Sequence, residues 1–457
     1  MKASNLVYRK KSTTCIFQVL CGLFFISLLG WNPVSAQTAD NKQSLQDLVH
    51  QFDEQAVADI AGVAGPHPIV LLGESTHGTS EYYQIRSELS KKLIEEYGFN
   101  FVLVEGDWNA SWQVNKYVKQ LPGAPESVRD ALRTFNNRWP HWMWNNEEML
   151  ELITWMRERN ERLPESERAG FYGMDVYSFW DSIDAVARVT DKLDESDASV
   201  IEEALDCFLR FNRNHENYLR NVMSTGQHCG RQIRSAHNTV QNMEKPDGFS
   251  DHDWLYLRQN MNVILQGDLH YRGMLERGPA SWNERVNHFK QSLTYMLNWY
   301  TENYGIWEPK GIVWAHNTHV GDARATDMRH SGMRNIGELA RVSYGKESVF
   351  AIGFGTYTGR VNAGTSWASA MEIMRIPEAQ IGSLEFHLNN LEYPDLWLDL
   401  NEERTAEIFS DPLPHRAIGV VYQPELDSRQ NYVTTILSER YNAFIFIRET
   451  TALTPLD

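Results

Sequence analysis

Residues 69–86 read IVLLGESTHGTSEYYQIR, and the rest of the chain is organised around this stretch. Four apolar residues come first, the run breaks at Gly73, and apolar residues then recur every three or four positions until Gly98. This pattern predicts a buried strand, a tight turn and a helix. Ligands of open α/β sheets bind at the carboxyl ends of the strands. We therefore expect the polar residues of the turn, among them Glu74 and His77, to lie at a functional edge.

The same layout returns further along the chain. The apolar run FNFVLV (99–104) ends at Glu105, AGFYGM (169–174) ends at Asp175, and GIVWA (311–315) is followed by HNTH. Three later strand candidates are residues 349–354, 417–422 and 443–447. Strands that alternate with helical segments predict βαβ units and a parallel sheet.

The middle of the chain has a different pattern. Between about residues 178 and 304 helical spacing dominates and no strand candidate occurs. We therefore predict an α/β fold with a mostly parallel sheet flanked by helices and an inserted all-helical cap, or lid. The predicted segments are a signal peptide (1–36), the first part of the α/β core (37–178), the cap (179–304) and the second part of the core (305–457).

The first 36 residues have the pattern of a targeting segment. Basic residues lead, the stretch 15–29 is mostly apolar, and Pro33-Val34-Ser35-Ala36 offers small residues for a signal peptidase. We predict cleavage near Ala36 and export to the periplasm or the medium; the alternative is an uncleaved membrane anchor. No other run is apolar enough to span a membrane, so no stable span is expected after cleavage.

Composition narrows the class of protein. The 457 residues carry a formal net charge of −17, and this acidic balance argues against a nucleic-acid partner. Cys207 and Cys229 remain after signal cleavage in an oxidising compartment, which makes them candidates for a disulfide bond. The 15 tryptophans fit either a large core or a cleft for an apolar ligand.

Reactive side chains follow three of the predicted strands. Because the carboxyl ends of parallel strands share one edge of a sheet, we expect these groups and one arginine of the first helix to converge: Glu74, His77, Arg86, Glu105, His316 and His319. An imidazole is a natural general base for water, and a neighbouring carboxylate fixes its tautomer. We predict His77 as the base, Glu74 or Glu105 as the group that orients it, and Arg86 as the stabiliser of a developing oxyanion.

Other interpretations of these residues remain open. Each carboxylate is also a suitable helix cap, and Arg86 a suitable ion-pair partner. Two glutamates and three histidines suit zinc or manganese, although no compact ligand motif is present. Ser75 lies in a near match to the G-x-S-x-G nucleophile elbow, with His77 in the place of the closing glycine. A further class is a non-catalytic envelope protein that binds an apolar ligand.

Longer motifs resemble the erythromycin esterase family over nearly all of the mature sequence. They include GESTHGTSEYYQIR, VLVEGDWNASWQVNKYV, RWPHWMWNNEE, FYGMDVYSFWDSI, VWAHNTHVGDARAT and GFGTYTGRV. In SWNERVNHF the family usually has Asp in the place of Val286 and Met in the place of Phe289.

The resemblance implies a carboxylic ester hydrolase. Members of that family hydrolyse the lactone ester of macrolide antibiotics without a metal, and some confer antibiotic resistance. By resemblance, His77 is the general base, and the polar groups that orient the base, the water and the carbonyl are Glu74, Arg86, Glu105, His316 and His319. The expected substrate is a small-molecule ester or lactone, macrolides among them, and neither a cofactor nor a metal is expected.

Overall fold

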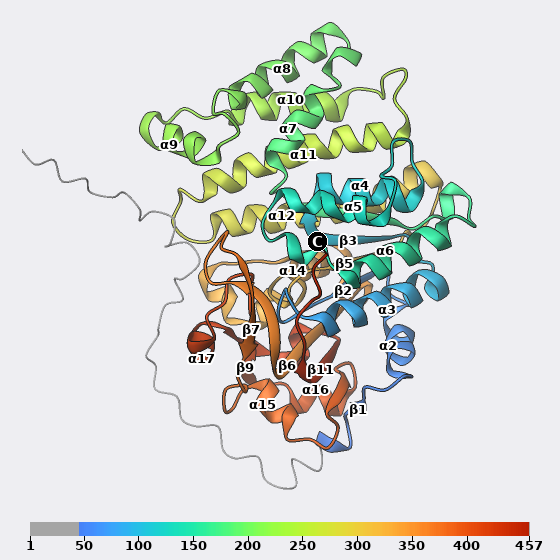
Figure 1. The fold of residues 1–457 in the computed structure, drawn as a ribbon, viewed down its shortest axis with the longest axis vertical. Coiled ribbons are helices and arrows are strands. Elements are labelled where there is room, and N and C mark those ends of the chain that lie inside the picture. Colours follow the sequence, from blue (N-terminus) through green and yellow to red (C-terminus); the bar gives the residue numbers. More distant parts are fainter. Residues whose placement is uncertain (1–44, 457) are drawn as a thin grey trace, which may run out of the picture.

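A central sheet organises the molecule (Figure 1). The computed structural model describes residues 45–456, so the predicted signal peptide at 1–36 lies outside the described residues. Nine strands of this described part form one sheet in the order β1-β8-β11-β6-β2-β5-β3-β4, and β7 pairs with β6. Along that order the bounds are His50–Gln51, Asp395–Asp399, Ala443–Thr450, Val349–Gly364, Ile69–Leu72, Gly311–Trp314, Phe101–Asp107 and Gly170–Asp175, with β7 at Met371–Ile376.

The six strands from β11 to β4 run parallel, and the strands at the other side of the sheet are antiparallel. β5, which comes late in the chain, lies between β2 and β3. The carboxyl ends of β2, β5, β3 and β4 are therefore neighbours at one edge. The predicted α/β fold with a mostly parallel sheet is confirmed.

Strand periodicity divides the core between the two faces of the sheet. Val70 and Leu72 of β2 belong to a buried cluster that also takes in α3 (Ser80–Tyr97) and α6 (Glu147–Asn160). Ile69 and Leu71 belong to the cluster on the opposite face, which includes α12 (Ala280–Tyr304) and α14 (Ile336–Tyr344). Successive side chains of a strand point to opposite faces, so an all-apolar strand needs helices on both sides.

One predicted strand is wrong. Residues 417–422 form only isolated bridges, between Ile418 and Thr76 and between Val421 and Gly364. The extended segment lies earlier, in β9 (Pro412–Arg416), which pairs with β10 (Tyr432–Ile436) in a separate two-stranded sheet. A short apolar run without a continuous neighbouring strand does not form a ladder.

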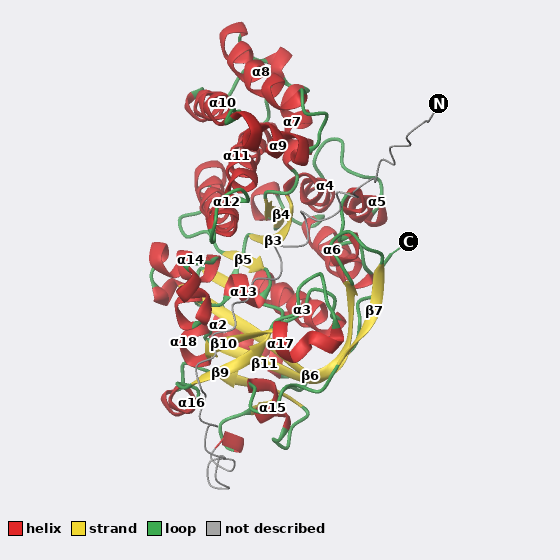
Figure 2. Cartoon of the chain, turned by 90° about the vertical axis from the view of Figure 1, so that its left-hand side faces the viewer, coloured by secondary structure: helices red, strands yellow, loops and turns green. Residues whose placement is uncertain are grey.

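Helices between residues 179 and 304 are stacked at one end of the molecule (Figure 2). They are α7 (Phe179–Ala187), α8 (Glu195–Leu209), α9 (His215–Thr225), α10 (Gly230–Asn242) and α11 (Asp251–Gly273). These five share a hydrophobic cluster of their own, whereas α12 contributes to the core of the sheet. The division into core and cap segments remains a prediction.

The other helices are short, apart from α4. They are α2 (Ala56–Ala64), α4 (Trp108–Lys119), α5 (Val128–Arg133), α13 (Asn317–Val320), α15 (Leu384–Asn389), α16 (Glu403–Ile408), α17 (Asp427–Gln430) and α18 (Leu437–Arg440). Among the residues that the structure describes, no helix has the length and apolarity needed to cross a membrane.

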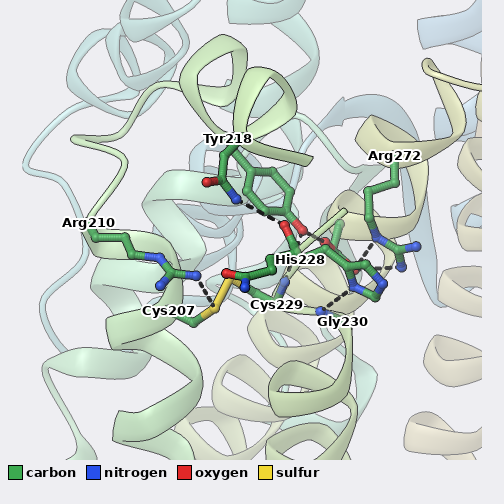
Figure 3. Close-up of a disulfide and its surroundings, with 10 residues drawn as sticks. Cys207, Arg210, Tyr218, His228, Cys229, Gly230 and Arg272 are labelled. Atoms are coloured by element: carbon green, nitrogen blue, oxygen red, sulfur yellow. Dashed lines mark hydrogen bonds and ion pairs between the residues drawn. A yellow bond between two sulfur atoms is a disulfide. The ribbon is translucent and has the colours of Figure 1, made fainter. Parts of the chain in front are cut away.

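Cys207 and Cys229 form a disulfide bond, with their Cα atoms 5.8 Å apart. Figure 3 shows the bond joining α8 to the residue just before α10, beside Tyr218 of α9. The Cys229 backbone N–H donates a hydrogen bond of 3.2 Å to the Tyr218 hydroxyl. The bond expected from the cysteine count is present and joins α8 to the start of α10, while the hydrogen bond to Tyr218 attaches α9.

Replacing both cysteines by serine is expected to destabilise the cap. Closing a loop with a sequence separation of 22 removes entropy from the unfolded chain, which corresponds to about 3 kcal/mol. Urea unfolding of the wild type and of the double variant measures this loss. In the presence of a reductant, the wild type should unfold at the same urea concentration as the variant. Coincident curves for the oxidised wild type and the variant would contradict the expected contribution.

Candidate active site

Two glycines allow the turn after β2 to approach its neighbours. A Cβ atom on Gly73 would lie 2.2 Å from Asn317 Oδ1, and one on Gly78 would lie 2.1 Å from the carbonyl oxygen of Asn362. The bare backbone therefore packs directly against the ends of β5 and β6. This close fit fixes the segment that carries Glu74 and His77.

Glu74 joins a histidine to an arginine. Its Oε1 accepts a hydrogen bond of 2.8 Å from His77 Nδ1, and its Oε2 accepts one of 2.6 Å from Arg86 Nη2. Burial lowers the pKa of the His77 imidazole, but the hydrogen bond and the charge of Glu74 outweigh burial and raise the pKa above 6.5. Because Nδ1 donates to Glu74, Nε2 of neutral His77 is an unprotonated acceptor. Nε2 forms no hydrogen bond within residues 45–456, and His77 retains 8% exposure.

Arg86 has a different position from the one predicted for an oxyanion stabiliser. It is 0% exposed, and its guanidinium carbon lies over the rings of Tyr83 and Trp314, 4.3 and 4.6 Å from their centroids. A side chain enclosed in this way does not reach a substrate. The structure instead makes Arg86 the group that holds the second oxygen of Glu74 and so orients His77 through it.

His316 lies beside His77 at the end of β5. The two rings have centroids 4.8 Å apart, so the two imidazoles contact each other. Nδ1 of His316 accepts from the Thr318 backbone N–H at 3.3 Å and lies 2.8 Å from the Thr318 hydroxyl. This contact places the proton of the neutral ring on Nε2. Burial holds the pKa of His316 well below its usual value, so the ring is neutral at pH 7.

Glu105 connects the second half of the site. Its Oε2 accepts the backbone N–H of His316 at 2.9 Å, and its Oε1 lies 3.2 Å from His319 Nε2 and 2.8 Å from Arg285 Nη2. Burial alone would raise the pKa of Glu105, but His319 and Arg285 bring it well below 4.5. Burial also lowers the pKa of His319, whose ring stacks on Trp282 at 4.4 Å.

Two charged residues complete this network and were not predicted. Arg285 of α12 donates to Asp175 Oδ1 at 2.9 Å as well as to Glu105. Burial opposes the charge on Arg285, but Asp175 and Glu105 raise the Arg285 pKa well above its usual value. Asp175 is the last residue of β4, and Glu105 lies near the end of β3. The pattern of polar residues at strand ends therefore includes Asp175. No local pattern distinguishes Arg285, because its helix lies far along the chain and only packing brings it to the sheet.

The six predicted residues therefore lie in one network that spans the ends of β2, β5 and β3. Three buried carboxylates each have a cationic partner: Glu74 pairs with the buried Arg86, and Glu105 and Asp175 pair with Arg285, whose side chain is 12% exposed. Burying an unpaired charge costs several kcal/mol, so these pairings are a condition for folding.

Two alternative chemistries have less support in this geometry. The Ser75 hydroxyl is buried and lies 2.7 Å from the Tyr82 hydroxyl, and within the described residues it forms no hydrogen bond to a histidine. In the part of the chain that the structure describes, no group of three or more His, Cys, Asp or Glu side chains is arranged to hold a metal ion.

One cavity of the described part of the chain lies away from this network. It measures about 570 Å³ and is lined by residues of α10 and α11, including Arg231, Arg234 and Arg272. None of the six predicted residues lines it. The candidate site is thus identified by its buried charges and by the free nitrogen of His77, not by the size of a pocket.

Replacing Glu74 by glutamine is expected to lower the pKa of His77 to below 6.5. Removing the carboxylate charge leaves burial as the dominant influence, and burial favours the neutral ring. The raised pKa also means that His77 stabilises the fold below pH 6.5 and loses this contribution as pH rises through its folded value. NMR titration of the histidine rings measures the shift, with Glu88→Gln, an exposed change on α3, as the control. An unchanged His77 titration in Glu74→Gln would refute the assignment.

Known proteins resemble this chain in sequence and in fold. The family model described as erythromycin esterase matches residues 94–450, a range that includes Glu105, Asp175, Arg285, His316 and His319 and begins after the Glu74–His77 turn. YbfO from Bacillus subtilis (strain 168), described as a candidate hydrolase, is 22% identical over 414 residues, 84% of each chain.

Three solved structures share the fold. A protein from Bacillus cereus has a TM-score of 0.73 at 16% identity, covering 91% of this chain and 98% of its own. A succinoglycan biosynthesis protein has a TM-score of 0.72 at 18% identity, covering 90% and 97%. A mutant of the erythromycin esterase EreC in its open conformation has a TM-score of 0.58 at 15% identity, covering 87% and 94%. With a family match over most of its length, the chain belongs to the erythromycin esterase family and is a hydrolase.

Proposed function

We propose that this protein hydrolyses a carboxylic ester or lactone with a water molecule activated by His77, without a metal ion. One observation carries the proposal: within the described residues, Glu74 binds Nδ1 of His77 and leaves its Nε2 without a hydrogen bond, and the His77 ring lies beside that of His316. A general base needs an unprotonated nitrogen within reach of water and a partner that accommodates its positive charge. Glu74 supplies that partner at 2.8 Å.

In the first step, His77 Nε2 takes a proton from water while the water oxygen attacks the carbonyl carbon. The carbonyl π electrons move to the oxygen and form a tetrahedral oxyanion. Glu74 stabilises the imidazolium that results, and Arg86 keeps Glu74 in place. We assign the Nε2–H of neutral His316 as the donor to the oxyanion, because Thr318 fixes the orientation of this ring.

In the second step, the tetrahedral intermediate collapses and the bond to the alcohol oxygen breaks. The imidazolium of His77 returns its proton to the leaving alkoxide, so the products are an acid and an alcohol and the base is regenerated. Arg285 contributes a fixed positive charge near the site, while Glu105 holds the backbone of His316. One water is consumed for each ester bond broken.

An aromatic cluster extends from the site and supports an apolar substrate. Tyr177, two residues after β4, lies 5.0 Å from the Arg285 guanidinium, and its ring is 6.4 Å from that of Trp367. Trp367 in turn contacts Trp139 at 4.9 Å and is 55% exposed. An exposed tryptophan next to partly buried aromatic rings offers apolar area to a ligand. We propose that the bulky part of the substrate, such as a macrolide ring or another large apolar group, lies against this cluster.

Export of the protein is part of the same proposal. The apolar N-terminal segment ending near Ala36 has the pattern of a signal peptide, and the Cys207–Cys229 bond is typical of oxidising compartments. Hydrolysis would then take place outside the cytoplasm.

The variant His77→Asn is expected to lose about 10²- to 10⁴-fold in kcat on an ester substrate, because it lacks a base of suitable pKa. Wild-type protein treated with EDTA should retain its activity. A lactone panel monitored by mass spectrometry for the gain of one water measures both. Full activity in His77→Asn would exclude this base, and loss of activity on chelation with recovery on adding zinc or manganese would favour the metal-dependent alternative. Ligand binding without turnover would favour a non-catalytic binding protein.

The variant Trp367→Ala is expected to raise KM for a large apolar ester by about tenfold, which corresponds to roughly 1.4 kcal/mol of lost contact. KM for a small acetate ester should stay the same, because that substrate does not reach the cluster. Trp307→Ala is the matched control, since Trp307 is 88% exposed and precedes the amino end of β5. Equal effects of the two variants would show that the cluster plays no part in binding.

A further inference from the structure

Asn317 stands between two catalytic candidates and uses all of its polar atoms. Its backbone N–H donates to the Glu74 carbonyl at 2.8 Å, which ties the end of β5 to the turn after β2. Its side-chain Oδ1 accepts from the Phe354 N–H at 3.2 Å, and its Nδ2 donates to the Phe354 carbonyl at 2.7 Å. Asn317 therefore connects the end of β5 to the turn after β2 and to the middle of β6, and His316 directly precedes it.

The second hydrogen of Nδ2 points to another buried histidine. Nδ2 of Asn317 lies 3.1 Å from His415 Nε2, and His415 Nδ1 lies 2.6 Å from Glu385 Oε1. Asn317, His415 and Glu385 are each 0% exposed. The same Glu385 oxygen accepts the backbone N–H of Arg416 at 2.8 Å. A histidine and a carboxylate thus lie behind the catalytic residues, in a layer that the substrate does not reach.

The hydrogen bonds determine the tautomer of His415. The carboxylate of Glu385 accepts, so His415 Nδ1 carries the proton, and Nε2 is left to accept from Asn317. Rotating the Asn317 amide by 180° would place oxygen against His415 Nε2 and against the Phe354 carbonyl. The orientation of Asn317 is therefore imposed from both sides, and it requires a neutral His415.

We propose that Glu385 and His415 are positioning residues for ester hydrolysis: they lock the amide of Asn317 and thereby hold His316 and Glu74 at the spacing that catalysis requires. This inference rests on the proposed function. The chain of contacts runs from Glu385 through His415 to Asn317, and from Asn317 by one peptide bond to His316 and by one hydrogen bond to Glu74. None of the three residues touches the substrate.

The charges around His415 fit this role. Glu385 favours a protonated ring, whereas Arg416 and Arg440 disfavour it, and the rings of Tyr441 and Phe444 enclose the imidazole. Burial, the largest influence, lowers the pKa of His415 below 6.5. The pKa of His415 therefore lies below that of His77, so the His415 ring favours the neutral form, which offers an acceptor to Asn317, at the pH where His77 loses its proton.

The first experiment is the variant Asn317→Asp. The introduced carboxylate has no hydrogen to donate, so it repels both the Phe354 carbonyl and His415 Nε2 unless one extra proton binds. We expect kcat to fall by about 10²-fold at pH 8, as for other small displacements of catalytic groups, with little change in KM. The ratio of variant to wild-type kcat should rise as the pH is lowered, because a proton shared between the introduced carboxyl group and His415 restores a donor.

Asn160→Asp is the matched control. Asn160 is also 0% exposed, donates from Nδ2 to the carbonyls of Val118 and Ala169 and accepts the Ala169 N–H, but lies near the amino end of β4. Its replacement should cost comparable stability in urea and leave kcat and its pH profile unchanged. If both variants lose kcat in proportion to stability, Asn317 has only a structural role and the proposal is wrong.

A second pair of variants tests His415 itself. His415→Gln keeps an acceptor near the position of Nε2, whereas His415→Asn keeps only a donor near Nδ1. We expect His415→Gln to retain most of the wild-type kcat and His415→Asn to resemble Asn317→Asp. Equal kcat values for the two variants would overturn the proposal.

A measurement without substrate separates this inference from the proposed function. NMR of protein labelled with ¹⁵N-histidine reports the tautomer of each ring, and His415→Gln identifies the His415 signals. We expect a neutral Nδ1–H ring for His415 and altered His316 signals in Asn317→Asp. If the wild type hydrolyses no ester but these signals behave as stated, the proposed function fails while the positioning network stands. A His415 ring protonated at Nε2, or unchanged His316 signals, would refute the network.

Discussion

The structure depends on one buried carboxylate. Glu74 accepts from Arg86 on one oxygen and from His77 on the other, and these two partners compensate the cost of removing the charge from water. The arginine is fixed by two aromatic rings, so the carboxylate has a defined orientation before any ligand arrives. The histidine that completes the arrangement is consequently held with one nitrogen bound and the other available. A base prepared in this way needs little rearrangement during a reaction.

Sheet topology brings the rest of the site to this carboxylate. β5 is inserted between β2 and β3, so His316 lies between the groups delivered by the two earlier strands. Parallel strands linked through helices expose their carboxyl ends at a common edge, and polar side chains are tolerated there because the ladder stops. Glu105 uses both oxygens across that edge, holding the His316 backbone with one and contacting Arg285 with the other.

Helix α12, which follows β4 in the chain, supplies the positive charge that balances the carboxylates at the ends of β3 and β4. Arg285 arrives on α12, more than a hundred residues after Asp175, and balances two carboxylates that would otherwise be unpaired. Stability and reactivity are linked here, since the same ion pairs that permit folding also set the charge around His77. Buried polar groups behind the site are paired in the same way: His415 forms hydrogen bonds with both Glu385 and Asn317.

Local patterns in the sequence determined the strands β2, β3, β4 and β5 and the position of the turn at Glu74–His77. They also identified the six candidate site residues. Both results were possible because apolar periodicity and polar residues at strand ends are properties of short segments. The same logic failed for residues 417–422, where an apolar run lacks a continuous partner strand. Only the tertiary structure decided which strand lies beside which, that Arg86 is enclosed and not exposed to a substrate, and that Arg285 and His415 join the network. Those facts depend on contacts between residues distant in the chain, and such contacts leave no periodic signal in the sequence.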